Sequence, residues 1–345
     1  MKERYTYMDW AKAIGIALIC IGHFLPHGYP PKVVMYAFHV PLFAFVSGLL
    51  TTAPESLLAA LKKIGKLAVR ILVPYTVWHW LSALLYLRLG LKTLSDAWST
   101  WFFLDGCTIW NDALWYAPSI FLVSAVFCLL CLIIRKSTLL ALGISALSLT
   151  GFVLLDTFDV TVTAFGHANL LGAHNLLLLM GFLALGYACR ELLSKLASRT
   201  ENPRKNPWLY GCAIAFLALL GVTTLIHKQD PISLLYGDYN GCLLFAVLAV
   251  LLVITMVPAC ALLPKNRIAL LLSRHSLLIM CSHYFLLRLW VWEPNLPGGH
   301  ETATVRFSLA VSALLLYVLI GLVADALCRR FPKCRLPLRW LGMGY

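Results

Sequence analysis

Long apolar stretches separated by short polar segments dominate the sequence. They lie near residues 10–26, 34–51, 71–90, 114–134, 138–155, 174–190, 208–226, 240–263, 274–292 and 304–327. A helix needs about 20 apolar residues to cross the hydrocarbon core of a bilayer, and each stretch is close to that length. The pattern predicts an all-α fold, a polytopic membrane helix bundle with about ten transmembrane helices, in one domain over residues 1–345.

Composition points to the same class of protein. Hydrophobic residues make up 61% and charged residues 12% of the 345 positions, whereas soluble proteins average about 45–50% apolar and about 25% charged residues. These values exclude a soluble enzyme, a disordered tail and a secreted disulfide scaffold. The segments between the apolar stretches are too short to form separate catalytic domains, so any chemistry must use the bundle.

The distribution of basic residues predicts an orientation. A net charge of +13 would suggest nucleic-acid binding in a soluble protein, but membrane proteins concentrate lysine and arginine in cytoplasmic segments. If the N-terminus lies in the cytoplasm, 22 of the 28 lysines and arginines fall on cytoplasmic segments or on the cytoplasmic ends of spans. The other six are Lys32, Arg88, Lys92, Lys228, Arg288 and Arg306. We therefore expect both termini in the cytoplasm, contact with membrane lipids and no nucleic-acid partner.

Cysteine usage indicates neither disulfides nor a metal site. The total of 11 is odd, and all but Cys107 fall in apolar or cytoplasmic segments. Cys128 and Cys131 have C-x-x-C spacing, but the leucines and isoleucine around them are typical of a lipid-embedded helix. We interpret both as small hydrophobic residues and expect no metal.

The first apolar stretch carries a lysine and a histidine on one helical face. Lys12 and His23 are eleven residues apart, and eleven steps of about 100° come within about 20° of three full turns. Along the axis they would be about 16 Å apart, with Lys12 near the cytoplasmic interface and His23 in the outer half of the bilayer. The alternative is a snorkelling lysine and a capped interfacial histidine.

Further polar residues lie near these two positions. His39 is close to the outer end of the second stretch, and Ser47 is near its inner end, where helix packing is the simpler role. Lys66 belongs to a basic run before the third stretch, and Arg70 lies so far into the apolar sequence that ordinary solvation is difficult. Such residues bind phosphates, although topology alone would also explain a basic run.

Later positions give weaker indications. His283 is near the middle of its stretch, with a structural and a functional role equally open. Trp115 fits an aromatic belt, although an aromatic face also suits stacking against a sugar. Several polar residues of the outer loops could contact sugar hydroxyls, although most such residues are merely solvated. They are Asp105, Asn111, Asp112, Asp156, Asp159 and Asp238.

Six sequence blocks together resemble the acyltransferase-3 family of integral membrane O-acyltransferases, in particular its fucose 4-O-acetylase-like branch. The blocks are Asp9 to Lys12 with Gly22-His23, Phe38-His39-x-Pro41-x-Phe43 with Ser47-Gly48, Pro74-Tyr75, Leu114-Trp115-Tyr116, Gly181-Phe182 with Leu185-Gly186, and Ser273 to Leu277 with His283. Relatives often carry Arg-x-x-Arg in the basic run; here Leu67 follows Lys66, so Lys66 and Arg70 are the nearest equivalents.

The resemblance implies transfer of an acyl group to a sugar hydroxyl of an envelope glycan or its precursor. The group is most often acetyl, with cytoplasmic acetyl-CoA as co-substrate, and the enzyme would lie in the bacterial cytoplasmic membrane. His23 would act as general base or acyl relay, and His39 would orient it or bind the acceptor. Lys12, Lys66 and Arg70 would hold the acyl donor, while Trp115, His283 and Ser47 are weaker substrate-binding candidates.

Two other classes of function remain open from the residues alone. A transporter or flippase would also place His, Lys and Arg within the bundle for proton coupling, although no repeat of two related halves is apparent. A structural partner of a glycan-assembly complex would tolerate substitution of His23 and His39.

Overall fold

The structure, a computed structural model, is built from helices. It describes residues 6–26, 29–88, 90, 93–102, 111–135, 137–158, 173–198, 205–226, 234, 241–291 and 302–345, and this part of the chain contains no β-strand. Among the residues named above, Asp105, Cys107, Asp159 and Asp238 lie outside these ranges, as do Lys92 and Lys228. The prediction of an all-α bundle is confirmed.

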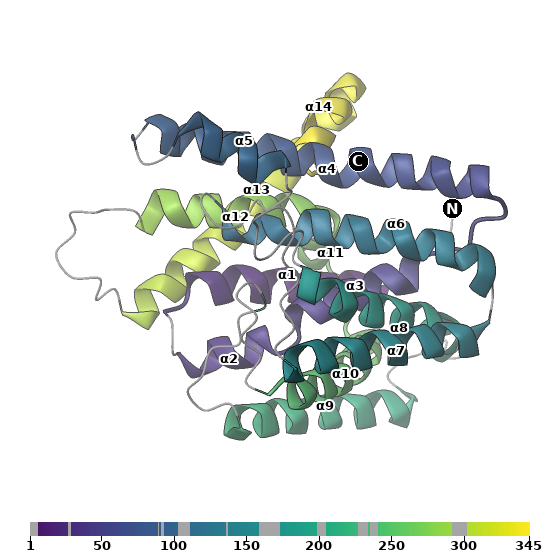
Figure 1. Ribbon diagram of the computed structural model, residues 1–345. Helices are drawn as coiled ribbons and strands as arrows, with labels where there is room; N and C mark the ends of the chain where they lie inside the picture. Colours follow the sequence, from purple (N-terminus) through teal and green to yellow (C-terminus); the bar gives the residue numbers. More distant parts are fainter. Residues whose placement is uncertain are drawn as a thin grey trace.

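The α-helices run back and forth through the molecule, mostly along one direction in Figure 1. Their bounds are α1 Thr6–Phe24, α2 Pro30–Tyr36, α3 His39–Leu50, α4 Leu57–Arg88, α5 Leu94–Phe102, α6 Tyr116–Ile134, α7 Thr138–Thr157, α8 Ala173–Ser198, α9 Pro207–Ile226, α10 Cys242–Ala259, α11 Arg267–Arg274, α12 Ser276–Val291, α13 Ala303–Arg330 and α14 Arg335–Trp340. Short 3₁₀ turns are η1 Asp112–Trp115, η4 Cys260–Leu262 and η5 Pro332–Cys334.

Seven helical segments within the described ranges are long and apolar enough to cross a membrane. They are Pro30–Leu50, Asp112–Ile134, Thr138–Thr157, Asn175–Lys195, Pro207–Ile226, Cys242–Leu262 and Ala303–Arg330. An eighth is reached if α11 and α12, which meet at an angle of 78°, form one broken span. The two remaining predicted spans fall in α1 and α4, so a total of ten and the cytoplasmic termini stay predictions.

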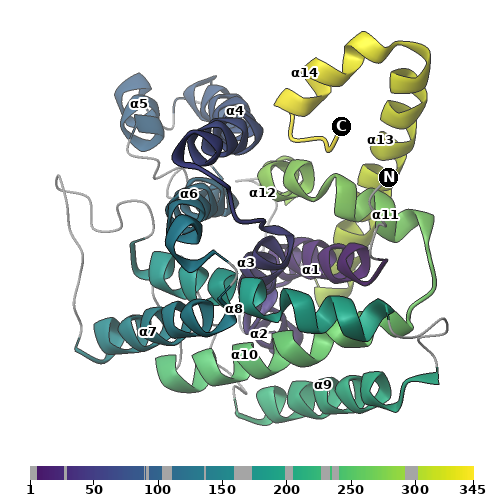
Figure 2. The ribbon, with the colours of Figure 1, turned by 90° about the vertical axis from the view of Figure 1, so that its right-hand side faces the viewer.

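Helix α1 occupies the middle of the bundle. It contacts α3 on one side and α11, α12 and α13 on others, and Figure 2 shows it surrounded by these helices. Ala11, Ile16 and Cys20 on α1 are completely buried, because small and branched apolar side chains let several helices approach it. The face that carries Lys12 and His23 is therefore directed at protein rather than at lipid.

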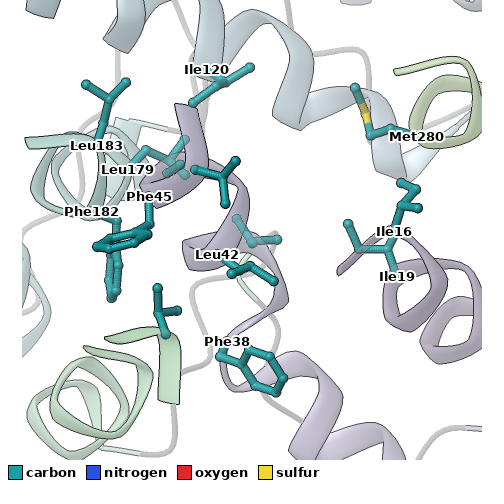
Figure 3. Packing of buried hydrophobic residues seen from close by; sticks show 14 of the residues in the cluster. Ile16, Ile19, Phe38, Leu42, Phe45, Ile120, Leu179, Phe182, Leu183 and Met280 are labelled. Carbon is teal, nitrogen blue, oxygen red and sulfur yellow. The ribbon is translucent and has the colours of Figure 1, made fainter. Parts of the chain in front are cut away.

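Helices α3 and α8 pack with their backbones in close contact. Gly48 lies beside the backbone of Leu183, and Gly186 lies beside the backbone of Phe45, so neither position has room for a Cβ atom. Around this contact Phe45 lies among Phe182 and other apolar side chains of α8 (Figure 3). Small residues at such contacts allow van der Waals packing between helices where lipid supplies no hydrophobic driving force.

Three helical segments differ from the predicted spans. The predicted span 34–51 is broken at Ala37 and Phe38 into α2 and α3, and the span 274–292 begins at the bend on His275. Helix α4 is one helix from Leu57, so the basic run is helical and continuous with the predicted span 71–90. Apolar length alone could not place these boundaries, because the break before α3 and the bend at His275 depend on packing against other helices.

Candidate active site

His23 lies in the last turn of α1 among aromatic side chains from two other helices. Its ring centroid is 5.0 Å from that of His283 on α12 and 5.6 Å from that of Tyr284, which it meets edge to face. The Tyr36 hydroxyl of α2 lies 3.2 Å from His23 Nδ1. His23 is partly exposed, whereas His39 and His283 are buried.

Two further histidines, His39 and His283, lie near the last turn of α1, and each has a defined tautomer when it is neutral. Nδ1 of His39 lies 2.7 Å from the carbonyl oxygen of Met35, and Nδ1 of His283 lies 2.8 Å from that of Ile279. Because a carbonyl only accepts, each Nδ1 carries the proton and each Nε2 presents a lone pair. His283 is fully buried, and its Nε2 has no hydrogen-bond partner in the described part of the chain.

These three histidines belong to one cluster. The Tyr36 ring lies between His23 and His39, with centroids 5.6 Å and 4.8 Å away. The break between α2 and α3 makes this possible, since it turns the first residue of α3, His39, inward to 3% exposure. We call His23, Tyr36, His39, His283 and Tyr284 the histidine cluster.

Polar residues next to the histidine cluster form hydrogen bonds with Tyr284 and with α12. The Tyr284 hydroxyl donates to Asp112 Oδ2 at 2.5 Å, and Arg288 Nη2 donates to the Tyr284 oxygen at 3.3 Å. Buried Asn111 ties η1 to α12 by donating to the carbonyl of Cys281 at 2.8 Å. Asp112 and Asn111 therefore form hydrogen bonds to α12. From the sequence, most of the outer polar residues were expected to be merely solvated.

At the opposite end of α1, basic residues line a cavity of about 390 Å³, which we call the inner cavity. Lys12 of α1 and Lys66 and Arg70 of α4 lie in its wall together with Ser47 of α3. Lys66 and Arg70 are four residues apart on one helix and so project from the same face. The Arg70 side chain is exposed to this space rather than enclosed by apolar residues.

The inner cavity extends toward the histidine cluster. Ile19 of α1 and Met280 of α12 line it, and Figure 3 shows the side chains of these two residues near each other. Ile19 is one helical turn from His23, or about 6 Å along the axis, and Met280 is three residues before His283. The described residues thus form a route that begins at cations and ends one turn short of the cluster.

The remaining predicted residues have more ordinary positions. Ser47 Oγ donates to the carbonyl of Phe43 in its own helix at 2.8 Å. Trp115 is 8% exposed and packs beside Tyr116, so its ring contacts protein and not the surface where an aromatic belt would lie. Tyr116, which the sequence places beside Trp115 in the Leu114-Trp115-Tyr116 block, lines the inner cavity instead.

The cysteine pair has no metal-binding geometry around it. Cys128 and Cys131 are buried in α6, and Cys128 is in the wall of the inner cavity. Within the described ranges, no three His, Cys, Asp or Glu side chains converge on a point that would hold a metal ion.

Comparison with known families decides the class of protein. The profile of the acyltransferase-3 family, described as an acyltransferase domain, matches residues 5–326. The chain belongs to the acyltransferase-3 family. Neither a search of curated proteins nor a search of solved structures finds a match.

For this acyltransferase-3 protein the match covers the histidine cluster and the predicted donor residues, but it ends inside α13. Residues 327–345, which include α14, follow the matched range. The match establishes a multi-pass membrane acyltransferase, while the fucose 4-O-acetylase-like branch and the roles of individual residues stay predictions.

Sequence reasoning missed Tyr36 and Tyr284 and gave no role to Arg288. One signal was present, since Tyr284 directly follows His283 and is four residues before Arg288, which places a tyrosine and an arginine on one helical face. Nothing local linked Tyr36 to His23, because that contact depends on how α2 packs against α1.

Tyr284→Phe tests the polar network. The substitution keeps the ring against His23 and removes the hydroxyl bonded to Asp112. We therefore expect acyl transfer to fall about 10- to 150-fold, which corresponds to about 1.5–3 kcal/mol for a hydrogen bond to a charged group. Initial rates of the purified variant at saturating donor measure this. Tyr187→Phe, which removes a hydroxyl that donates to the carbonyl of Arg135 between α8 and the end of α6, is the matched control. Equal rates for wild type and Tyr284→Phe would contradict a positioning role.

Proposed function

We propose that this protein is a membrane O-acetyltransferase. It takes the acetyl group of acetyl-CoA at the basic end of the bundle and transfers it to a sugar hydroxyl of an envelope glycan, or of a glycan precursor, at the histidine cluster. The proposal places it in the bacterial cytoplasmic membrane, with the basic end in the cytoplasm. Membership of the acyltransferase-3 family supports acyl transfer, and the identity of donor and acceptor is the proposed part.

The observation that carries the proposal is the alignment of cations, cavity and histidine along α1. Lys12 lines the inner cavity near one end of the helix, Ile19 lines it further along, and His23 follows one turn later. Phosphates of a CoA-type donor would bind Lys12, Lys66 and Arg70 through charge-assisted hydrogen bonds. The pantetheine arm would then lie in the cavity with its thioester directed at His23.

The chemical step follows from the histidine. Nδ1–H of His23 would donate to the Tyr36 oxygen, leaving Nε2 to remove the proton of the sugar hydroxyl as its oxygen attacks the thioester carbonyl carbon. The tetrahedral intermediate collapses by breaking the C–S bond, and the departing sulfur takes the proton from the His23 imidazolium. An acetyl ester and free CoA result, and His23 returns to its neutral form.

His39 and His283 would bind the acceptor. Each holds its Nδ1 proton on a backbone carbonyl, so each Nε2 is an acceptor suited to a sugar hydroxyl. The Nε2 of His283 has no hydrogen-bond partner among the described residues, and its ring lies 5.0 Å from that of His23, so it would be available to a hydroxyl held beside the base. Two fixed acceptors beside the base would select which hydroxyl reacts.

Turnover of acetyl-CoA by the purified chain in nanodiscs tests the proposal. Radiolabelled acetyl should leave CoA and appear on added glycans, with no stable label on protein if transfer is direct. Stable label on His23 would instead indicate an acyl-histidine relay. If the folded protein neither binds nor consumes acetyl-CoA, the donor assignment is wrong, and transport across sealed vesicles becomes the next assay.

A further inference from the structure

The segment after α13 folds back over the basic end of the bundle. Trp78 of α4 donates its indole N–H to the carbonyl of Leu341 at 3.1 Å, and the Gly344 N–H donates to His275 Nδ1 at 3.4 Å. The Tyr345 hydroxyl donates to Asp325 of α13 at 3.2 Å. These bonds attach residues 341–345 to α4, to α13 and to the bend between α11 and α12, so the segment has a defined position.

Two glycines allow this close approach. A Cβ atom on Gly344 would lie 2.3 Å from the carbonyl oxygen of Arg274, and one on Gly342 would lie 2.9 Å from the backbone nitrogen of Leu278. Gly342 also has a φ of +95°, in the region that favours glycine. The segment therefore lies directly on the bend between α11 and α12, where a side chain would hold it away.

The segment and the bundle enclose a second cavity of about 950 Å³, which we call the vestibule. Lys12, Lys66 and Arg70 line both the vestibule and the inner cavity, so the two spaces are adjacent. On the other wall α14 adds Arg339 and Trp340.

Charge and aromatic character set the chemistry of the vestibule. Arg274 adds a further cation, although it is paired with Asp325 at 2.9 Å. Arg339 donates from Nε to the main-chain oxygen of Tyr345, and its two Nη groups carry further donors. The described residues that line the space include no aspartate or glutamate side chain. Trp340 is 49% exposed beside them. Several cations with an accessible indole are suited to a nucleotide, because arginine binds phosphates and aromatic rings stack on bases.

We propose that the vestibule binds the nucleotide end of the acyl donor, an adenosine bearing phosphates, and that Arg339 and Trp340 determine specificity for it. Trp340 stacks on the adenine and Arg339 binds a phosphate, while Lys12, Lys66 and Arg70 hold the phosphates nearer the inner cavity. This inference rests on the proposed function, and it assigns a donor-binding role to residues beyond the range matched by the family profile.

The test measures donor binding by the full chain in nanodiscs. Adenosine 3′,5′-bisphosphate should displace acetyl-CoA from the wild type, and Trp340→Ala and Arg339→Ala should each weaken acetyl-CoA binding by about tenfold or more. Trp340→Phe should recover most of the affinity. Neither Trp208→Ala, on the exposed surface of α9, nor Arg335→Ala, on α14 outside the vestibule lining, should change it.

A donor that lacks the nucleotide shows whether Trp340 and Arg339 act by contacting the nucleotide or by supporting the structure of the protein. Turnover of S-acetylpantetheine should be the same in wild type, Trp340→Ala and Arg339→Ala. Equal losses with both donors, unchanged acetyl-CoA binding in both variants, or no displacement by the bisphosphate would each overturn the inference while leaving the transferase intact. Failure of the wild type to bind or consume acetyl-CoA would overturn the proposed function and the inference together.

Discussion

Replacing His23 with alanine is expected to lower acetyl transfer by about 10²- to 10⁴-fold, the usual contribution of a positioned general base. The other imidazoles of the histidine cluster keep their Nδ1 protons on backbone carbonyls, and the one nearest to His23 is fully buried. In the proposed mechanism their Nε2 atoms bind the acceptor, so neither takes over as the base. Single-turnover rates with saturating acetyl-CoA, normalised to monodisperse protein, measure the effect.

His79→Ala is the matched control for losing a histidine. His79 is fully buried in α4, where its Nε2–H donates to the carbonyl of Ala97 at 3.0 Å between α4 and α5, away from the histidine cluster. We expect this variant to be less stable while its rate per folded molecule stays near that of the wild type. Acetyl transfer by His23→Ala within about tenfold of the wild type would remove His23 from the proposed mechanism.

Alanine at Gly48 or Gly186 is expected to cause the largest loss of stability. A Cβ atom at these positions would lie 1.9 Å from the carbonyl oxygen of Leu183 and 2.0 Å from that of Phe45, respectively. Both obstacles are backbone atoms, so α3 and α8 would have to separate along their contact. Overpacking costs about 1–3 kcal/mol or more, and we expect the upper end of that range because no side chain can move aside.

Thermal unfolding followed by the loss of monodisperse protein in detergent measures this cost. Gly143→Ala and Gly211→Ala are matched controls, because a Cβ at either helical position would meet no atom of the described residues within 4 Å. Alanine favours the helix over glycine by about 1 kcal/mol, so the controls should be as stable as the wild type or more so. Similar melting of all four variants would mean that α3 and α8 do not pack this closely.

Much of the candidate site was predictable because helical spacing is a local property. Lys12 and His23 were assigned to one face of one helix, and α1 contains both, with the cavity wall between them. Lys66 and Arg70 were grouped with Lys12 as donor residues, and all three line the inner cavity. Their catalytic and binding roles stay predictions for the experiments above.

Contacts between helices were not predictable in this way. Asp112 was grouped with residues that are mostly solvated, yet it accepts the hydroxyl of a tyrosine on α12, and Trp115 was expected near the surface but is buried. Both outcomes depend on the short turn η1, which Asn111 ties to α12 far along the chain. A single sequence carries no information on that pairing.

The class of the fold and the residues at both ends of the candidate route could be read from the sequence, because apolar length dictates membrane helices and a period of 3.6 residues dictates which side chains share a face. Which helices meet became evident only from the folded arrangement. The break before His39 turns this residue toward the other two histidines, the 78° bend at His275 sets the direction of α12, which carries His283, and two glycines let α3 and α8 touch. These features arise from packing between distant segments, where the energies of many contacts, and not local spacing, select one arrangement.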